Sequence, residues 1–198
     1  IRSMEAARDY LATVAAPVPP PAPPAPPAVP PDPRSIAVLP FANLSPDPEN
    51  ECFADGMAEE VLAVLSRVEG LKVASRTSAF AFKGRDASLA EIARELNVAH
   101  LLEGSVRRQD QRVRITVQLV DATKGFPLWS QNFDRELVDI FAVQEEIAQA
   151  ISSALGGALG IESAAQPVRV AQPTADLGAY EAYLRGRYLW NRWNRQSF

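Results

Sequence analysis

The sequence predicts an α/β (α+β) domain in which a mixed sheet of about five strands has helices packed on it. Three observations support this fold class. Short apolar runs alternate with amphipathic helical patterns at first, three strand-like runs then follow one another, and a long amphipathic pattern comes last. The expected order is therefore strand–helix–strand–helix–strand–strand–strand–helix.

The first strand is expected at residues 35–41, where "SIAVLPF" is a continuous apolar run. Such a run is typical of a strand buried on both faces. A helical stripe follows, which we expect Asp55 to open as its cap and Gly70 to end. Residues 71–75 then predict a short second strand, joined to the first by a right-handed parallel crossover.

The second helix is expected over residues 88–97. Ser88 and Glu91 have the spacing of a capping box, and Asn97 is a favourable C-terminal residue. Before it, residues 77–84 are ambiguous, and a helical turn is the best interpretation.

Three strand-like runs follow, over 98–108, 112–122 and 127–134. A loop of two or four residues between the first two places their apolar residues on one face, whereas a three-residue loop would break the match. The residues expected on that core face are Leu102, Gly104, Val106, Val113, Ile115, Val117 and Leu119. The final helix is expected over 137–158.

The flanking segments indicate that the sequence is a piece of a longer protein. Eleven prolines within residues 17–33 exclude helix and sheet and favour polyproline II. This run is interpreted as a spacer, and a PxxP ligand for an SH3-like partner stays open as an alternative. The expected organisation is an upstream tail at 1–16, a linker at 17–34, the α/β domain at 35–160, a linker at 161–175 and the truncated start of a helical region at 176–198.

Composition limits the class of protein. The net charge of −4 argues against a general nucleic-acid binder, which should be strongly basic. One Cys and one His exclude an intramolecular disulfide and the usual His/Cys zinc sites. No apolar run approaches the roughly 20 residues of a membrane helix. We expect no cofactor.

The loop over residues 42–56 stands where α/β enzymes bind phosphate, but it is acidic and has its first glycine at its end. Its carboxylates would repel a phosphate. A calcium loop of the EF-hand kind would need Gly at Cys52 and Glu at Ala58. The acids are instead expected to favour the positive end of the helix. They also form a candidate partner surface, made of Asp47, Glu49 and Glu51.

No catalytic set is expected, because His100 and Cys52 are far apart in sequence and no serine lies in a nucleophile motif. A second candidate partner surface consists of the hairpin arginines Arg107, Arg108, Arg112 and Arg114. If Arg107 lies opposite Arg114, the pair is unfavourable unless an anion or a carboxylate intervenes. An acidic partner and a solvated face relieved by neighbouring acids stay open.

The stretch that begins "SIAVLPFANLSPDPENECFADGMAEEVLAVL" and the later "LNVAHLLEGSVRRQDQRVRITVQLVDATKGFPLWSQNFD" resemble the TolB-like (TolB N-terminal-like) domain of bacterial multidomain signalling proteins. The resemblance covers about 35–155, and it departs at Cys52, where relatives have an aromatic residue. It implies a non-enzymatic α/β module joined to winged-helix regulators, nucleotide cyclases or Ser/Thr kinases. "AYEAYLRGRYLWNRW" is similar to the lead-in of a tetratricopeptide-repeat region, and "RSMEAARDYLATV" to the end of a kinase domain.

The expected function is a non-catalytic protein-interaction or sensory domain used in signal transduction. The alternative is a small-ligand-binding regulatory domain of a parent Ser/Thr kinase or adenylate cyclase whose catalytic domain lies elsewhere. Expected partners are an unidentified protein and the chain's own upstream or repeat domains, with no nucleic acid. No membrane helix precedes the module, which favours a cytoplasmic over a periplasmic setting but leaves the compartment undecided.

Overall fold

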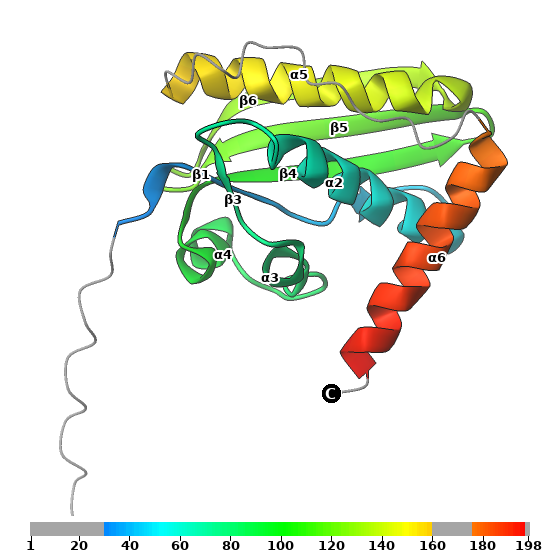
Figure 1. The fold of residues 1–198 in the computed structure, drawn as a ribbon, viewed down its shortest axis with the longest axis horizontal. Coiled ribbons are helices and arrows are strands. Elements are labelled where there is room, and N and C mark those ends of the chain that lie inside the picture. The colour runs from blue at the N-terminus through cyan, green and yellow to red at the C-terminus, as the bar shows by residue number, and fades with distance from the viewer. Residues whose placement is uncertain (1–29, 160–175, 197–198) are drawn as a thin grey trace, which may run out of the picture.

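The structure, a computed structural model, describes residues 30–159 and 176–196 (Figure 1). The expected upstream tail, most of the first expected linker and the whole of the second lie outside these residues. The strands are β1 (Asp32–Val38), β2 (Ala42–Asn43), β3 (Lys72–Val73), β4 (Val98–Gln109), β5 (Arg112–Asp121) and β6 (Phe126–Glu136). The helices are η1 (Pro48–Asn50), α2 (Glu51–Leu65), α3 (Arg76–Phe80), α4 (Leu89–Leu96), η2 (Leu137–Asp139), α5 (Ile140–Leu159) and α6 (Leu177–Gln196).

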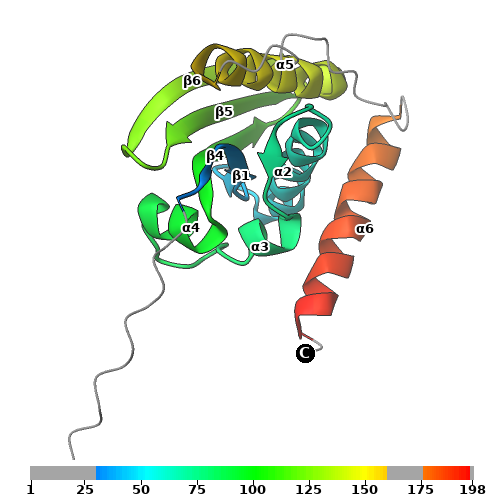
Figure 2. The same cartoon turned by 60° about the vertical axis from the view of Figure 1, so that its left-hand side comes forward.

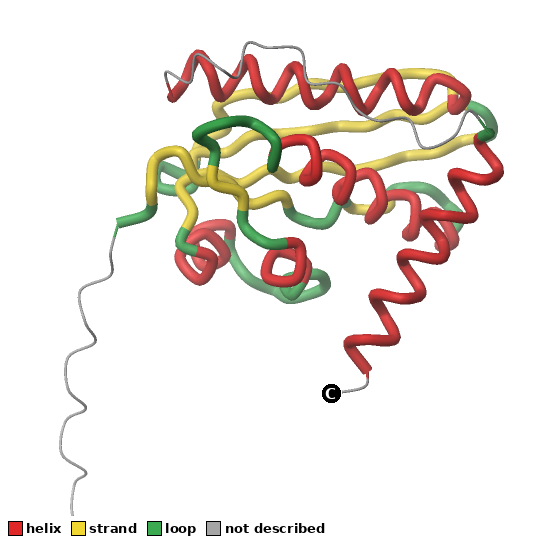
Figure 3. The backbone as a smooth tube through the Cα atoms, viewed as in Figure 1, coloured by secondary structure: helices red, strands yellow, loops and turns green. Residues whose placement is uncertain are grey.

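The strands form one mixed sheet (Figure 3), and their order is β3-β1-β4-β5-β6, with the short β2 also beside β4. The strand β1 is parallel to both of its neighbours, as the strand–helix–strand pattern predicted. Its residues Ile36, Ala37 and Val38 are fully buried although successive side chains point to opposite faces. The mixed α/β fold class is therefore confirmed, with one strand more than expected and a first strand that begins at Asp32.

The β4–β5 hairpin has the predicted register. Gln109 lies opposite Arg112, so the loop has two residues, and Leu102 faces Leu119 on the core side. Asp110 takes a left-handed conformation with φ of 53°, which Asp tolerates better than most residues. The alternation of apolar and polar residues was enough to fix this register.

The start of the first long helix differs from the prediction. The helix α2 begins at Glu51, and Asp55 is a buried residue inside it. The capping interaction occurs earlier, where Asp47 Oδ1 accepts a hydrogen bond from the Glu49 N–H at the start of η1. The prediction that Asp55 caps the helix is therefore wrong. The helix ends at Leu65, before Gly70.

The α4 helix has both predicted ends. The Ser88 side chain accepts from the Glu91 N–H, and the Glu91 carboxylate accepts from the Ser88 N–H. Asn97 ends the helix in the left-handed region with φ of 51°. The expected final helix is also present, with a first turn in η2 and an apolar stripe buried at Leu137, Ile140, Ile147 and Ile151.

Helices cover the two faces of the sheet unequally. α2 and α5 lie over one face, while α3 and α4 lie on the other side of β1 and β4 (Figure 2). Leu101 and Leu102 point to opposite faces of the sheet and are both fully buried, so the first half of β4 is covered on both faces. Toward the hairpin tip the second face is open, and Arg107, Arg114 and Asp134 on it are exposed. In the described part of the chain no helix is both long and apolar enough to cross a membrane.

Candidate docking site

The last helix, α6, packs against the domain instead of extending away from it (Figures 1 and 2). Tyr180 and Leu184, one turn apart on its inner side, are 1% exposed and belong to the main core. The Tyr180 hydroxyl accepts a hydrogen bond of 2.5 Å from Gln144 Nε2 on α5, and Gln144 is itself buried. Burial raises the pKa of Tyr180, so the hydroxyl stays protonated.

A glycine on α2 permits the close approach of α6. A Cβ atom at Gly56 would lie 2.6 Å from Cδ2 and 2.9 Å from Cδ1 of Leu184. Carbon atoms at van der Waals contact are about 3.5–4.0 Å apart, so any larger residue would push Leu184 outward. The absence of a side chain at Gly56 thus leaves the space that the Leu184 methyl groups occupy.

A buried carboxylate joins α6 to two other elements. Glu59 of α2 is 4% exposed, and its Oε1 accepts a hydrogen bond of 2.5 Å from Arg76 Nε at the start of α3. Its other oxygen forms an ion pair with Arg187 of α6, and Arg187 also reaches Glu60 at 3.2 Å. Since a buried charge is costly unless it is paired, Glu59 favours the docked position of α6.

The predicted acidic loop is divided among three tasks. Asp47 caps η1, Glu51 forms an ion pair of 2.5 Å with Lys83, and Glu49 lies 3.7 Å from Arg185 of α6. Lys83 also binds the buried Asp55 at 2.6 Å. These contacts connect the loop to α6 and to the segment after α3.

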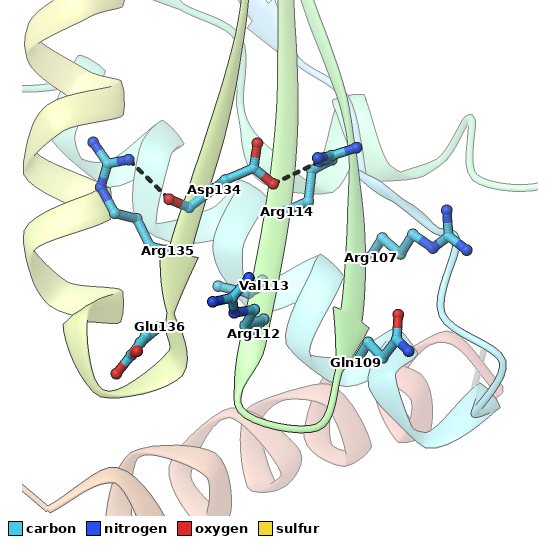
Figure 4. Close-up of a pocket in the computed structure, with 8 residues that line it drawn as sticks. All are labelled: Arg107, Gln109, Arg112, Val113, Arg114, Asp134, Arg135 and Glu136. Atoms are coloured by element: carbon cyan, nitrogen blue, oxygen red, sulfur yellow. Dashed lines mark hydrogen bonds and ion pairs between the residues drawn. The ribbon is translucent and has the colours of Figure 1, made fainter.

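The predicted hairpin arginines are divided in the same way. Arg108 points toward α6 and donates to Glu181 Oε1 at 2.6 Å. Arg107 lies opposite Arg114 as expected, and the carboxylate that relieves the pair is Asp134 of β6, 2.6 Å from Arg114 Nε. For the described residues, no ion pair or hydrogen bond of the Arg107 or Arg112 side chain is present. Figure 4 shows Arg114 joined to Asp134 and Arg107 pointing away from them.

Two grooves lie on either side of the hairpin tip. The first, of about 700 Å³, separates the acidic loop and the tip from α6, and it brings together parts of both predicted surfaces. Its lining includes Asp47, Glu49, Phe53, Arg108, Leu184 and Arg185. The second, of about 520 Å³, lies at the end of the open sheet face and contains Arg107, Arg112 and Arg114 (Figure 4). The role of α6 in the first groove was missed, although Tyr180, Leu184 and Arg187 have helical spacing that indicates one contacting face.

Cys52 and His100 are not brought together. Cys52 lines the groove beside Arg108, whereas His100 lies eight residues earlier on β4, about 26 Å along the strand. His100 is buried, with Nδ1 3.2 Å from the Ser35 carbonyl oxygen, and burial raises the pKa of the Cys52 thiol. Within residues 30–159 and 176–196, no three His, Cys, Asp or Glu side chains are grouped to hold a metal ion.

Comparison of the sequence with known protein families assigns the chain to one of them. The chain belongs to the family described as the second domain of HilA/YgeH-like transcriptional regulators, which it matches over residues 32–150. It is also 43% identical over 163 residues to a protein of Rhizobium meliloti (strain 1021) named "Putative adenylate cyclase 3". That match covers 82% of this chain but only 27% of the relative, so the chain spans about a quarter of that protein.

Similar solved structures include TolB, the namesake of the expected resemblance. The crystal structure of TolB from Acinetobacter baumannii has a TM-score of 0.47 and 19% identity, covering 62% of this chain and 28% of TolB. Lipoprotein GNA1162 from Neisseria meningitidis has a TM-score of 0.45 and 21% identity, covering 64% and 99%. The LpoB C-terminal domain from Salmonella enterica has a TM-score of 0.42 and 14% identity, covering 52% and 82%. The family assignment rests on the sequence match, and these likenesses add nothing to it.

Proposed function

We propose that this part of the chain is a non-catalytic docking module of a bacterial multidomain signalling protein. Its α/β domain holds the helical segment that begins with α6 in a fixed position, and the open sheet face binds a protein partner. The observation that carries the proposal is the docking of α6 through Tyr180, Leu184 and the buried Glu59. Buried apolar contacts and a desolvated ion pair in one interface are what a defined docking geometry requires.

The partner surface in this proposal is the arginine end of the open sheet face. Arg107 and Arg112 are exposed, and in the described residues their charges have no ion pair. Arg114, in contrast, is neutralised by Asp134. An acidic protein surface would therefore meet two available cations here, and arginine is enriched at such contacts.

Charge reversal tests this surface. The double substitution R107E/R112E should weaken capture of an acidic partner by about tenfold or more, because both cations become repulsive. R34E/R94E is a matched control, since both residues are exposed arginines for which, among the described residues, no ion pair is present, one on β1 and one on α4. Far-UV circular dichroism should be unchanged in both. Equal partner binding by R107E/R112E and by the unmodified chain would exclude the arginine surface.

A second candidate function is ligand-dependent regulation, and the groove beside α6 favours it. Its volume of about 700 Å³ lies in the range of small-molecule sites, and it opens between the domain and α6. A ligand bound there would change the stability of α6 docking. This change would in turn alter the activity of an effector domain elsewhere in the parent protein, such as a nucleotide cyclase or a kinase. Thermal unfolding with millimolar Mg-ATP and cyclic nucleotides tests it: ligand at a hundred times its Kd adds about 2.7 kcal/mol. An unchanged Tm across the panel would exclude these ligands.

A further inference from the structure

The strand β6 forms the only long edge of the sheet in the described part of the chain. It has 11 residues and pairs with β5 on one side only, and Figure 2 shows it at the outer limit of the sheet. The opposite edge is β3, which has two residues. An edge strand presents unpaired N–H and C=O groups along its length, and these can template a further strand.

The strand β6 is also much less covered than its neighbours. Nine of its 11 residues are exposed, and two of them, Phe126 at 69% and Leu128 at 43%, are large and apolar. Gln131 is exposed although it shares a face with the buried Phe133, which packs toward the core. α5 therefore leaves Gln131 uncovered, between the half-buried Trp129 and the buried Phe133 on the same face.

The features that protect natural edges from pairing are present only at the two ends of β6. Pro127 and a register irregularity lie at its start, and the charged residues Asp134, Arg135 and Glu136 lie at its end. Proline, bulges and charges are the usual means of blocking an edge. The six residues 128–133 between them carry neither a charge nor a proline. The centre of the edge is therefore free to pair.

We propose that β6 binds the β6 strand of a second copy of this chain, antiparallel, so that one sheet continues through a two-fold dimer. Among the described strands only β6 offers a long edge, because the two residues of β3 span only about 7 Å. A β6–β6 contact uses the same surface on both copies, so the assembly closes at two.

Self-pairing of β6 is chemically favourable in one register. When the two-fold axis passes through Gln131, the central residues 129–133 find partners, and Trp129 of each copy lies opposite Phe133 of the other. Aromatic cross-strand pairs are among the stabilising ones. The charged ends of the two copies, which carry Asp134 and Glu136, then lie at opposite ends of the ladder. A second copy therefore supplies one aromatic cross-strand pair on each side of the axis and keeps the like charges of the two ends apart.

The oligomeric state of the full chain tests the proposal. Sedimentation equilibrium between about 1 and 200 µM should show a concentration-dependent species of twice the 21.5 kDa chain mass. In Gln131→Lys, two lysines would face each other across the axis, and dimer affinity should fall about fivefold or more. Gln111→Lys is the matched control, with the same exposed chemical change at the hairpin tip. A monomer at every concentration, or a dimer that is indifferent to Gln131→Lys, would overturn the proposal.

Cysteine cross-linking tests the register independently of affinity. In a Cys52→Ser background, Gln131→Cys places the new thiols opposite each other, within the Cα separation that a disulfide accepts. Mild oxidation should give a covalent dimer, whereas Gln111→Cys in the same background should stay monomeric on a denaturing gel. A covalent dimer from Gln111→Cys and none from Gln131→Cys would show that a different surface pairs. Because α6, Arg107 and Arg112 are not part of β6, failure here leaves the proposed docking function to its own test.

Discussion

The contact between Gly56 and Leu184 makes the docking of α6 open to a quantitative test. In Gly56→Ala the added methyl would lie 2.6 Å from Leu184 Cδ2, so Leu184 must move away from α2. Overpacking of this kind costs about 1–3 kcal/mol. Alanine also raises the helix propensity of α2 by about 1 kcal/mol, but that gain stabilises α2 and does not hold α6.

The assay is amide hydrogen exchange of α6 followed by mass spectrometry. A loss of about 1–3 kcal/mol in docking corresponds to opening of α6 that is about 5- to 150-fold more frequent, with exchange in β4 and β5 unchanged. Leu184→Ala should raise the opening further, since burying leucine in such a site is worth about 2–5 kcal/mol.

The double variant Gly56→Ala, Leu184→Ala separates the contact from general damage. The methyl group added at position 56 then occupies space that the leucine side chain has left, so the two effects should be less than additive by about 1 kcal/mol or more. Unchanged exchange of α6 in Gly56→Ala, or strict additivity in the double variant, would refute the packing argument.

Three further substitutions test other parts of the account. Glu59→Gln removes the negative charge that Arg76 and Arg187 share and should lower the free energy of unfolding in urea by about 1–3 kcal/mol. The exposed control Glu95→Gln should lower it by less than about 1 kcal/mol. Equal losses in the two variants would contradict a buried ion-pair network at Glu59. A hydrogen bond from the Thr123 hydroxyl and nearby N–H donors lower the pKa of Asp121 from 3.8 to about 2. The ionised carboxylate therefore contributes to the free energy of unfolding above pH 3.8, and this contribution is lost as the pH falls through 2. Asp121→Asn should lower the free energy of unfolding by about 1 kcal/mol at neutral pH. The difference in Tm between the unmodified chain and this variant should therefore vanish in acid, and a Tm difference that stays constant with pH would exclude this linkage. Ser88→Ala removes the capping box of α4 and should cost about 0.5–2 kcal/mol, and a change of less than about 0.3 kcal/mol in the urea midpoint analysis would contradict its role.

The parts of the fold that could be predicted are those in which local chemistry decides the conformation. The register of the β4–β5 hairpin follows from alternation alone, because a shift by one residue would expose the whole apolar face. The ends of α4 follow from Ser88, Glu91 and Asn97, whose side chains satisfy the helix termini. Each of these signals lies within a few residues of the structure that it determines.

The errors occur where two local signals compete or where the partner is distant in sequence. Asp55 and Asp47 are both plausible caps, and Pro48 directly after Asp47 was the signal that favours the earlier start. Asp55 is instead buried against Lys83, 28 residues away. The packing of Leu184 against Gly56 is a contact between residues far apart in the chain, and no residue near either of them in the sequence indicates this contact.

The central claim is that the α/β domain holds α6 in one position, and a distance measurement tests it most directly. Spin labels at Gln111→Cys on the hairpin tip and Leu189→Cys on α6, in a Cys52→Ser chain diluted with unlabelled protein, occupy exposed sites on the two parts. Pulsed electron–electron resonance should give one narrow distance distribution, which broadens in Gly56→Ala. A broad distribution in the otherwise unmodified chain would mean that α6 is not held, and the docking module would have to be abandoned.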